Sequence, residues 1–222
     1  MRLQYGIALI AALLVCNPVA SYAKGYNARK QFSSSNPDAS WAYGYGTTGS
    51  SFTPYTNYTA SMNGVPGLQF WNISGDEISD IPYLGINATG ATYVLDGALV
   101  YPTNIVIDHP GPTVDSILQW TAPAAGTYKF TGLYEILDPT PTGIAALVFD
   151  GGTNITTTAF NGGTGVLTGP GANPTKGKPG GKETFSFQLT VVKGEVISFG
   201  LNNDGDYDND STGLSVIIKP AP

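Results

Sequence analysis

Four aspartates alternate with other residues in one short segment near the C-terminus. They are Asp204, Asp206, Asp208 and Asp210. Along a strand such residues share one face at about 7 Å spacing, and in a loop they can surround one centre. Carboxylates this close repel one another unless a cation lies among them. Because the segment offers oxygen ligands and neither His nor Cys, we predict a structural Ca²⁺ site at these four residues.

The acidic segment differs from an EF-hand loop. Counted from Asp204, the sixth position is Asn209 instead of glycine, and the twelfth is Ser215 instead of glutamate. The alternative interpretation is a solvated acidic turn. The Ca²⁺ prediction therefore depends on the clustering of carboxylates alone.

Three aromatic residues alternate in an early segment, at Trp41, Tyr43 and Tyr45. On a strand all three rings lie on one face. Aromatic rings stack on the apolar faces of sugars, while nearby Asn and Asp side chains bind the hydroxyls. The trio is therefore a candidate ligand-binding face, and the alternative is that its rings belong to the core.

Two further tryptophans lie in different surroundings. Trp71 has the polar neighbours Asn72 and Ser74, and we expect an exposed ring that binds a sugar. Trp120 ends the apolar segment 117–120, and we expect it in the core. Trp71 therefore joins the trio in the predicted ligand-binding set.

Two alternatives would make the protein an enzyme, and we predict neither. A Ser-His-Asp triad is formally possible at the single histidine, His109, but no Gly-x-Ser-x-Gly motif accompanies it and we expect a role in a turn. Glycoside hydrolysis needs two carboxylic acids at a fixed separation, for which Glu135 and Asp138 are candidates. Tyr134 shares a face with Phe130, so Glu135 points to the opposite side, where we expect solvent.

The elements that must position these residues have the pattern of β-strands. No segment of 12 or more residues after residue 23 has helical periodicity, whereas period-two alternation recurs. The alternation is clearest in residues 128–134, 185–191, 197–201 and 214–218. Shorter candidate strands are residues 41–45, 68–73, 92–95, 98–101, 104–107, 116–121 and 144–149.

About ten or eleven short strands separated by Gly and Pro predict an all-β fold, a two-sheet antiparallel jelly-roll β-sandwich. We expect a single domain over residues 24–222, because sandwiches of about 200 residues are usually one domain. Residues 161–181 form a long loop inside it, since 11 of these 21 residues are Gly or Pro. Loops of this length are usually either functional or mobile.

The first 23 residues have the pattern of a signal peptide. Arg2 is followed by the apolar run 5–15 and by the small-residue cleavage site 21–23, so we expect the mature chain to begin near Lys24. The run is roughly half of the about 20 residues that span a membrane, and we predict a secreted or periplasmic protein without a membrane anchor. The single cysteine, Cys16, leaves with this leader, which excludes disulfides, thiolate metal sites and a cysteine nucleophile.

The chain is acidic, with 10 basic and 16 acidic residues and a net charge of −6. Loss of Arg2 with the leader makes the charge of the mature protein about −7. This balance disfavours nucleic acids and anionic membranes as partners. Only 12% of the residues are charged, as in β-sandwiches, extracellular binding modules and small secreted glycan enzymes.

Several short motifs recur in an order and spacing that resemble a known family. They are Asn36-Pro37, Trp41-Ala42-Tyr43-Gly44-Tyr45, His109-Pro110-Gly111, Gln119-Trp120-Thr121-Ala122-Pro123 with Gly126-Thr127-Tyr128, and Asp210-Ser211-Thr212-Gly213-Leu214. The family is a β-sandwich domain of exported bacterial proteins, many of which carry a PEP-CTERM sorting tail. The resemblance implies a jelly roll similar to carbohydrate-binding and galactose-binding-like modules, generally without an assigned reaction. The sequence stops without such a tail, so we expect no anchoring by that route.

Three hypotheses for the function follow. The first is a secreted, non-catalytic carbohydrate-binding-like module with a structural Ca²⁺ site, whose partner is a polysaccharide or glycan. The second is a small jelly-roll glycan hydrolase or lyase, of which the lyase is disfavoured because Arg29 is the single arginine after the leader. The third is a subunit of an extracellular matrix or filament that self-associates through exposed sheet edges.

Overall fold

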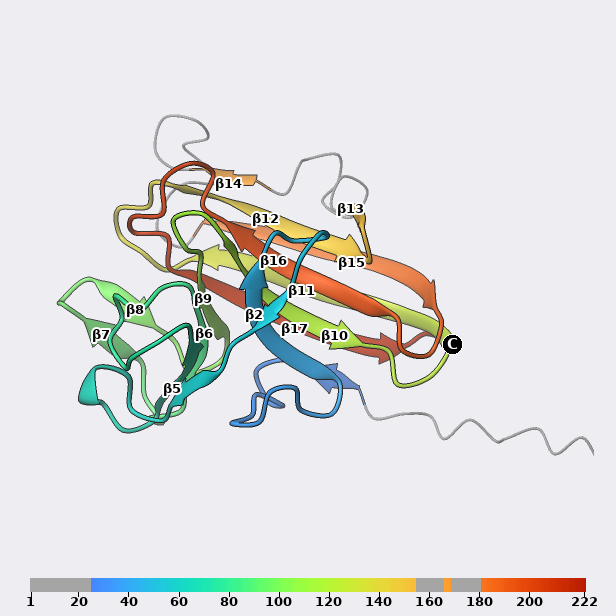
Figure 1. Cartoon of the computed structure of the whole chain (residues 1–222), viewed down its shortest axis with the longest axis horizontal. Coiled ribbons are helices and arrows are strands. Elements are labelled where there is room, and N and C mark those ends of the chain that lie inside the picture. Colours follow the sequence, from blue (N-terminus) through green and yellow to red (C-terminus); the bar gives the residue numbers. More distant parts are fainter. Residues whose placement is uncertain (1–24, 155–165, 169–180) are drawn as a thin grey trace, which may run out of the picture.

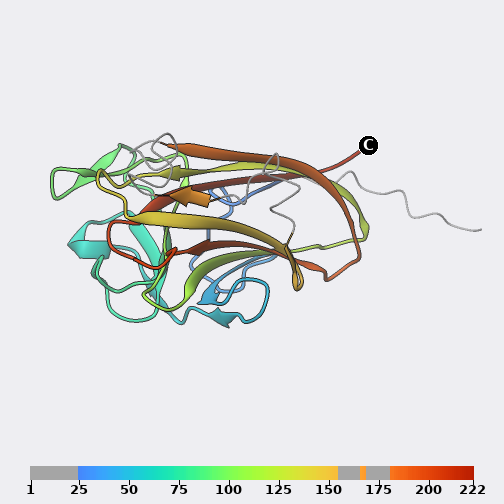
Figure 2. The same cartoon turned by 90° about the horizontal axis from the view of Figure 1, so that it is seen from above.

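The chain folds into antiparallel strands that form two stacked sheets, whose strands overlap in Figure 1 and are seen as two layers in Figure 2. The computed structural model describes residues 25–154, 166–168 and 181–222. Within these ranges it contains seventeen strands and one short 3-10 helix, η1 (Met62–Gly64). The predicted leader, residues 1–23, lies outside the described residues.

Eight strands form the larger sheet, seven form the smaller sheet, and two form a separate hairpin. The larger sheet consists of β1 (Tyr26–Asn27), β4 (Asn57–Thr59), β5 (Leu68–Asn72), β6 (Tyr83–Asn87), β9 (Val106–His109), β11 (Gly126–Ile136), β15 (Lys182–Val191) and β17 (Thr212–Pro220). The smaller sheet consists of β2 (Trp41–Gly46), β3 (Thr53–Pro54), β10 (Asp115–Thr121), β12 (Gly143–Asp150), β13 (Thr153–Asn154), β14 (Val166–Thr168) and β16 (Val196–Asn202). The hairpin consists of β7 (Tyr93–Leu95) and β8 (Leu99–Tyr101).

The strand pairing is that of a jelly roll. β9 pairs with β17, β10 with β16, β11 with β15, and β12 with β14, and every pair is antiparallel. Most consecutive strands of this set lie in opposite sheets, so the chain passes repeatedly from one layer to the other. The predicted all-β, two-sheet antiparallel jelly-roll β-sandwich is confirmed.

Inward-facing side chains of both sheets form the main core. On β10, Leu118 and Trp120 pair in register with Tyr43 and Trp41 of β2, and all four side chains are buried between the sheets. The core position predicted for Trp120 is confirmed. The alternating apolar residues of β11, β16 and β17 are buried in the same cluster. Removal of this apolar surface from water is the main stabilising contribution, at about 25 cal/mol per Å².

A second, smaller core lies on the outer face of the larger sheet at one end. Met62, Phe70, Tyr83, Tyr101 and Ile107 belong to it, and each is fully buried. The β7–β8 hairpin covers this face and brings Tyr101 into the cluster. In Figure 1 the hairpin lies beside β5 and β6 at the left-hand end of the sandwich. This second core fixes the hairpin near the loops that form the cleft described below.

The strand number differs from the expected ten or eleven because several strands are very short and one has no alternating pattern. All five residues of β6 are buried. Tyr83 faces the second core while Leu84 and Ile86 face the main core, so both faces of β6 are apolar and period two is lost. The expected strand 104–107 is shifted, since β9 runs from Val106 to His109. The predicted loop 161–181 lies outside the described residues except for β14 and Gly181.

Candidate functional site

The alternating aspartates do not share one face, and the structure does not bring the four predicted carboxylates to one centre. The side chains of Asp204, Asp206 and Asp208 are exposed, whereas Asp210 is buried. The segment is a loop between β16 and β17, and positive φ angles at Asp204 (46°), Gly205 (103°) and Asn209 (61°) turn the backbone. Within the described part of the chain, no group of three or more His, Cys, Asp or Glu side chains is arranged to hold a metal ion.

The same loop instead brings backbone carbonyls and one carboxyl to a threonine hydroxyl. Thr142 Oγ1, in the loop between β11 and β12, lies 3.1 Å from the Asp206 carbonyl oxygen, 2.6 Å from the Asp208 carbonyl oxygen and 3.0 Å from Asp210 Oδ1. The backbone N–H of Gly143 donates to Asp210 Oδ1 at 3.1 Å. We call Thr142 Oγ1, these two carbonyl oxygens and the Asp210 carboxyl the oxygen cluster.

The second carboxyl oxygen of Asp210 is buried and has no hydrogen-bond partner among the described residues. The residue is only 1% exposed. Burial raises the pKa of Asp210 to about 7, although the donors at Gly143 and Thr142 counteract this shift. The oxygen cluster is therefore rich in acceptors and poor in donors.

The expectation that Trp71 is an exposed ring is wrong. Trp71 is 6% exposed and belongs to the main core. Its indole N–H donates to the Ser33 carbonyl at 2.8 Å, and its ring stacks on Tyr43 and packs against Tyr58. The neighbouring Asn72 is also buried and accepts a hydrogen bond from Asn57. Asn72 thus bonds within the protein instead of marking a surface.

The rings of Trp41, Tyr43 and Tyr45 share one face of β2, as the alternation indicates, but that face lies in the main core. Trp41 is 2% and Tyr43 is 1% exposed, and Tyr45 is half-buried against Tyr55. Trp41 Nε1 donates to Gln31 Oε1 at 3.1 Å. The alternative interpretation, that the rings belong to the core, is therefore correct for Trp41 and Tyr43. Neither ring has a face open to a ligand.

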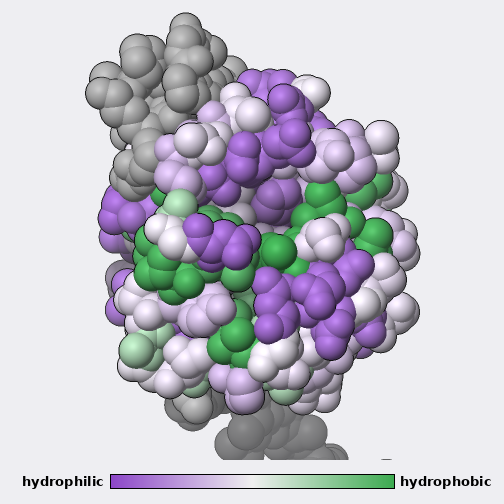
Figure 3. Space-filling view, turned by 90° about the vertical axis from the view of Figure 1, so that its left-hand side faces the viewer, coloured by the Kyte–Doolittle hydropathy of each residue, from purple (hydrophilic) through white to green (hydrophobic). Residues whose placement is uncertain are grey.

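A cleft opens instead at the end of the sandwich where five loops and strand ends meet. Two adjoining hollows of about 360 and 440 Å³ share Ile78, His109 and Asn209. The other lining residues include Tyr83, Leu95, Asp96, Leu99, Asp138, Thr140 and Ser211 in the first hollow and Ile81, Pro112, Tyr207 and Asp208 in the second. Figure 3 views this end and shows hydrophobic side chains near its middle with hydrophilic ones around them. We call this the loop-end cleft.

His109 contributes a neutral ring to the cleft. Its Nδ1 lies 2.7 Å from the Pro110 carbonyl oxygen, which can only accept, so Nδ1 carries the proton and Nε2 is an acceptor. The ring packs against Tyr83 with centroids 5.2 Å apart. Burial lowers the pKa of His109 to about 4, so the imidazole is uncharged at neutral pH.

Tyr207 is the exposed aromatic residue of the cleft. It is 37% exposed and lies beside Ile81 and Pro112. Sequence reasoning missed it because it stands inside the acidic segment, which we interpreted only as a metal site. The available signal was an aromatic residue in an otherwise polar loop, since a ring there has no apolar strand to join.

The lining of the cleft carries acidic groups and no basic ones among the described residues. Asp96 and Asp138 line one hollow and Asp208 the other. Asp138 is buried, Oδ1 accepts from the Thr140 N–H at 3.1 Å, and burial raises its pKa. The cleft therefore offers hydrogen-bond acceptors and a negative potential beside the ring of Tyr207.

The residues considered for catalysis do not assemble. Glu135 forms an ion pair with Lys182 at 3.1 Å and does not line the cleft, whereas Asp138 does. His109 directs Nδ1 at a backbone carbonyl, where a Ser-His-Asp triad would need a carboxylate. Glu135 is thus paired outside the cleft, and His109 Nδ1 is not oriented by a carboxylate.

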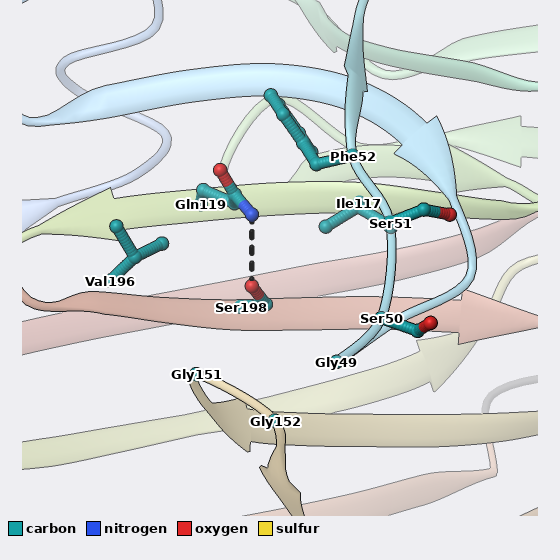
Figure 4. A pocket seen from close by; sticks show the side chains of 10 residues that line it. All are labelled: Gly49, Ser50, Ser51, Phe52, Ile117, Gln119, Gly151, Gly152, Val196 and Ser198. Carbon is teal, nitrogen blue, oxygen red and sulfur yellow. Dashed lines mark hydrogen bonds between the residues drawn. The ribbon is translucent and has the colours of Figure 1, made fainter.

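A third hollow, of about 350 Å³, lies on the outer face of the smaller sheet (Figure 4). The segment 47–52 lies over the sheet there, because Gly200 has no Cβ to meet Thr48. Gln119 Nε2 donates to Ser198 Oγ at 3.1 Å, and Phe52 is half-buried against Gly44. Some polar side chains of this hollow therefore already bond to each other. The loop-end cleft is the better candidate for a ligand-binding site.

No family model matches the sequence, and no curated protein matches it. The fold is similar to that of the tandem CBM51 modules of Sp3GH98, the family 98 glycoside hydrolase from Streptococcus pneumoniae SP3-BS71, with a TM-score of 0.39 and 10% identity over 81% of this chain and 48% of that chain. It is also similar to a family 35 carbohydrate binding module from an environmental isolate, with a TM-score of 0.26 and 16% identity over 52% of this chain and 77% of that one. This chain spans about half the length of the tandem-module chain. None of the described helices has the length and apolar character needed to cross a bilayer.

Proposed function

We propose that this protein is an exported, non-catalytic module that binds a neutral saccharide in the loop-end cleft and holds Ca²⁺ near the loop 203–210. The observation that carries the proposal is that the exposed ring of Tyr207 and the uncharged imidazole of His109 line the same hollow. A sugar presents an apolar ring face and a rim of hydroxyls, which such a pair of groups can bind together.

The charges of the cleft support a neutral rather than an anionic saccharide. Asp96, Asp138 and Asp208 line it, and no Lys or Arg does so among the described residues. A uronate or sulfate group would be repelled by these carboxylates and would find no cationic partner. Neutral hydroxyls can instead donate to the carboxyl oxygens and to His109 Nε2.

A glycan array with the mature protein tests this proposal. The array includes neutral, uronate-containing and sulfated glycans, and we expect signal only on neutral ones. Phe52→Ala, which removes a ring from the hollow on the smaller sheet, serves as a matched control and should keep the signal. Binding confined to acidic glycans, or no binding together with ordered self-assembly, would contradict the proposal and favour the matrix-subunit hypothesis.

The export part of the proposal has a separate test. Mass spectrometry of the protein secreted by a bacterial host should show an N-terminus within a residue or two of Lys24. Secreted protein that retains Met1 would contradict removal of the leader.

A further inference from the structure

The hydroxyl of Thr142 is surrounded by more acceptor oxygens than it can donate hydrogen bonds to. Three oxygens lie within 3.1 Å of Oγ1, namely the carbonyl oxygens of Asp206 and Asp208 and Asp210 Oδ1. A hydroxyl has one proton and donates it to one acceptor at a time. At least two of the three contacts therefore place lone pairs against lone pairs, which is unfavourable without a positive charge nearby.

Asp210 gives a second, independent indication of a cation. Among the described residues, its buried Oδ2 has no hydrogen-bond partner and no basic residue pairs with this carboxyl. The residue is 99% removed from solvent, since only 1% is exposed. A buried carboxylate with an unsatisfied oxygen is strongly destabilising unless it is paired or coordinates a metal.

We infer that the oxygen cluster is a cation site with four protein ligands: Thr142 Oγ1, the carbonyl oxygens of Asp206 and Asp208, and the carboxylate of Asp210. The donors are all hard oxygens, and backbone carbonyls are common ligands of Ca²⁺. Ca²⁺ takes six to eight oxygen ligands, so water completes the set. The ligands come from two loops 64 to 68 residues apart in sequence, which the cation ties together.

The site also determines where the ring of Tyr207 lies, a step that rests on the proposed saccharide binding. Asp206 and Asp208 flank Tyr207 in sequence, and their carbonyls both face the cation site. Their own carboxylates are exposed and take no part. A bound cation therefore fixes the backbone on both sides of Tyr207, and saccharide affinity depends on Ca²⁺.

Calorimetric titration of CaCl₂ into chelator-treated mature protein, with melting curves in Ca²⁺ and in EDTA, tests the site. We expect one bound Ca²⁺ and a higher melting temperature in Ca²⁺. Asp210→Asn should abolish both effects, and Thr142→Val should weaken Ca²⁺ binding about tenfold or more. If Asp210→Asn does not fold, Thr142→Val carries the test, because valine has nearly the shape of threonine.

Two further variants separate this site from the four-carboxylate hypothesis. Asp204→Asn, at an exposed side chain outside the cluster, is the matched control and should bind Ca²⁺ as the parent does. Asp206→Asn should also retain Ca²⁺, because only its carbonyl is a ligand. Loss of Ca²⁺ binding in Asp206→Asn with retention in Asp210→Asn, or no Ca²⁺ effect on the parent, would overturn the inference.

The dependence of saccharide affinity on Ca²⁺ is measured separately. Titration of a neutral glycan that scores on the array should give at least about tenfold weaker binding in EDTA than in Ca²⁺, with Ca²⁺ alone measured in parallel. Equal glycan affinity in both buffers, with Ca²⁺ binding present, would overturn the link but keep the cation site. Absence of glycan binding in both buffers would overturn the proposed function, and with it the link, while the Ca²⁺ titration still decides the site.

Discussion

The indole N–H of Trp71 donates a 2.8 Å hydrogen bond to the backbone carbonyl of Ser33, which joins β5 to the N-terminal segment across the edge of the main core. The ring also stacks on Tyr43 with centroids 6.2 Å apart. Trp71 therefore has a structural role.

Replacement of Trp71 should destabilise the protein strongly. Trp71→Ala removes a buried ring and leaves a cavity, so we expect the free energy of unfolding to fall by about 3 to 5 kcal/mol. Trp71→Phe keeps most of the packing and should cost less. Urea denaturation followed by tryptophan fluorescence measures both, and an unchanged midpoint for Trp71→Ala would contradict the buried position.

Tyr207→Ala should leave stability nearly unchanged and weaken glycan binding. The ring is 37% exposed in a loop, so we expect a stability change within about 0.5 kcal/mol. If the ring stacks on a sugar, its loss should weaken glycan binding by about 1 to 3 kcal/mol, by analogy with bases that stack on aromatic side chains. Calorimetry with a neutral glycan measures this, and Tyr207→Phe, which keeps the ring, should retain most of the affinity.

Two neighbouring titratable groups make stability depend on pH. Asp108 is fully buried, neither of its carboxyl oxygens has a hydrogen-bond partner among the described residues, and burial, reinforced by the charge of Asp115, raises its pKa to about 8. Asp108 thus keeps its proton in the folded protein up to about pH 8, but loses it near pH 4 in the unfolded chain. Its contribution to stability is complete below about pH 4 and is lost as the pH rises to about 8.

His109 acts in the opposite direction at lower pH. Its pKa is lowered to about 4, so the unfolded chain binds a proton between about pH 4 and 6.5 that the folded chain does not. The slopes of Asp108 and His109 offset each other there, whereas Asp210, whose pKa is raised to about 7, adds a loss that the parent and Asp108→Asn share. We therefore expect the loss due to Asp108, at about 1.4 kcal/mol per pH unit, as the difference between these two proteins between about pH 6.5 and 8. Urea denaturation of the parent and Asp108→Asn in the same buffers isolates this loss. A parent curve parallel to that of Asp108→Asn above pH 6.5 would contradict the prediction.

Gly200 permits the segment 47–52 to lie on the smaller sheet. A Cβ at this position would lie 1.9 Å from Thr48 Oγ1, and Thr48 donates from both its N–H and its hydroxyl to Asp115 at 2.7 and 2.6 Å. Gly200→Ala should therefore cost about 1 to 3 kcal/mol through overpacking and displacement of Thr48.

Gly152→Ala is the control for this substitution. Its Cβ would meet only the Gly49 carbonyl oxygen at 3.5 Å, an ordinary contact, so we expect a change within about 0.5 kcal/mol. Thermal unfolding compares the two variants. Equal melting temperatures for both variants would contradict the prediction, because the segment 47–52 would then move aside without loss of stability.

Period-two alternation in the sequence was sufficient for the core strands and for the class of fold. Phe130, Phe199 and Val216 alternate with polar or small residues, and a strand with one buried face must show this pattern. The same rule places Trp120 in the core. It could not reveal β6, because a strand covered on both faces has no polar side to alternate with.

The candidate site depended on contacts that no local pattern encodes. Trp71 looked exposed because its neighbours Asn72 and Ser74 are polar, yet a segment 38 residues earlier covers the ring. The aspartates alternate in sequence, but left-handed residues such as Asp204 and Asn209 break the alternation of their side chains in space.

The sequence by itself determined an acidic, glycine-rich and proline-rich all-β chain whose alternating strands must pack as two sheets, because only one face of each such strand can be buried. Tertiary structure alone decided which loops meet. The jelly-roll pairing of β11 and β17 and of β12 and β16 brings Thr142 to Asp210 across 68 residues, and this long-range contact creates the oxygen cluster behind Tyr207.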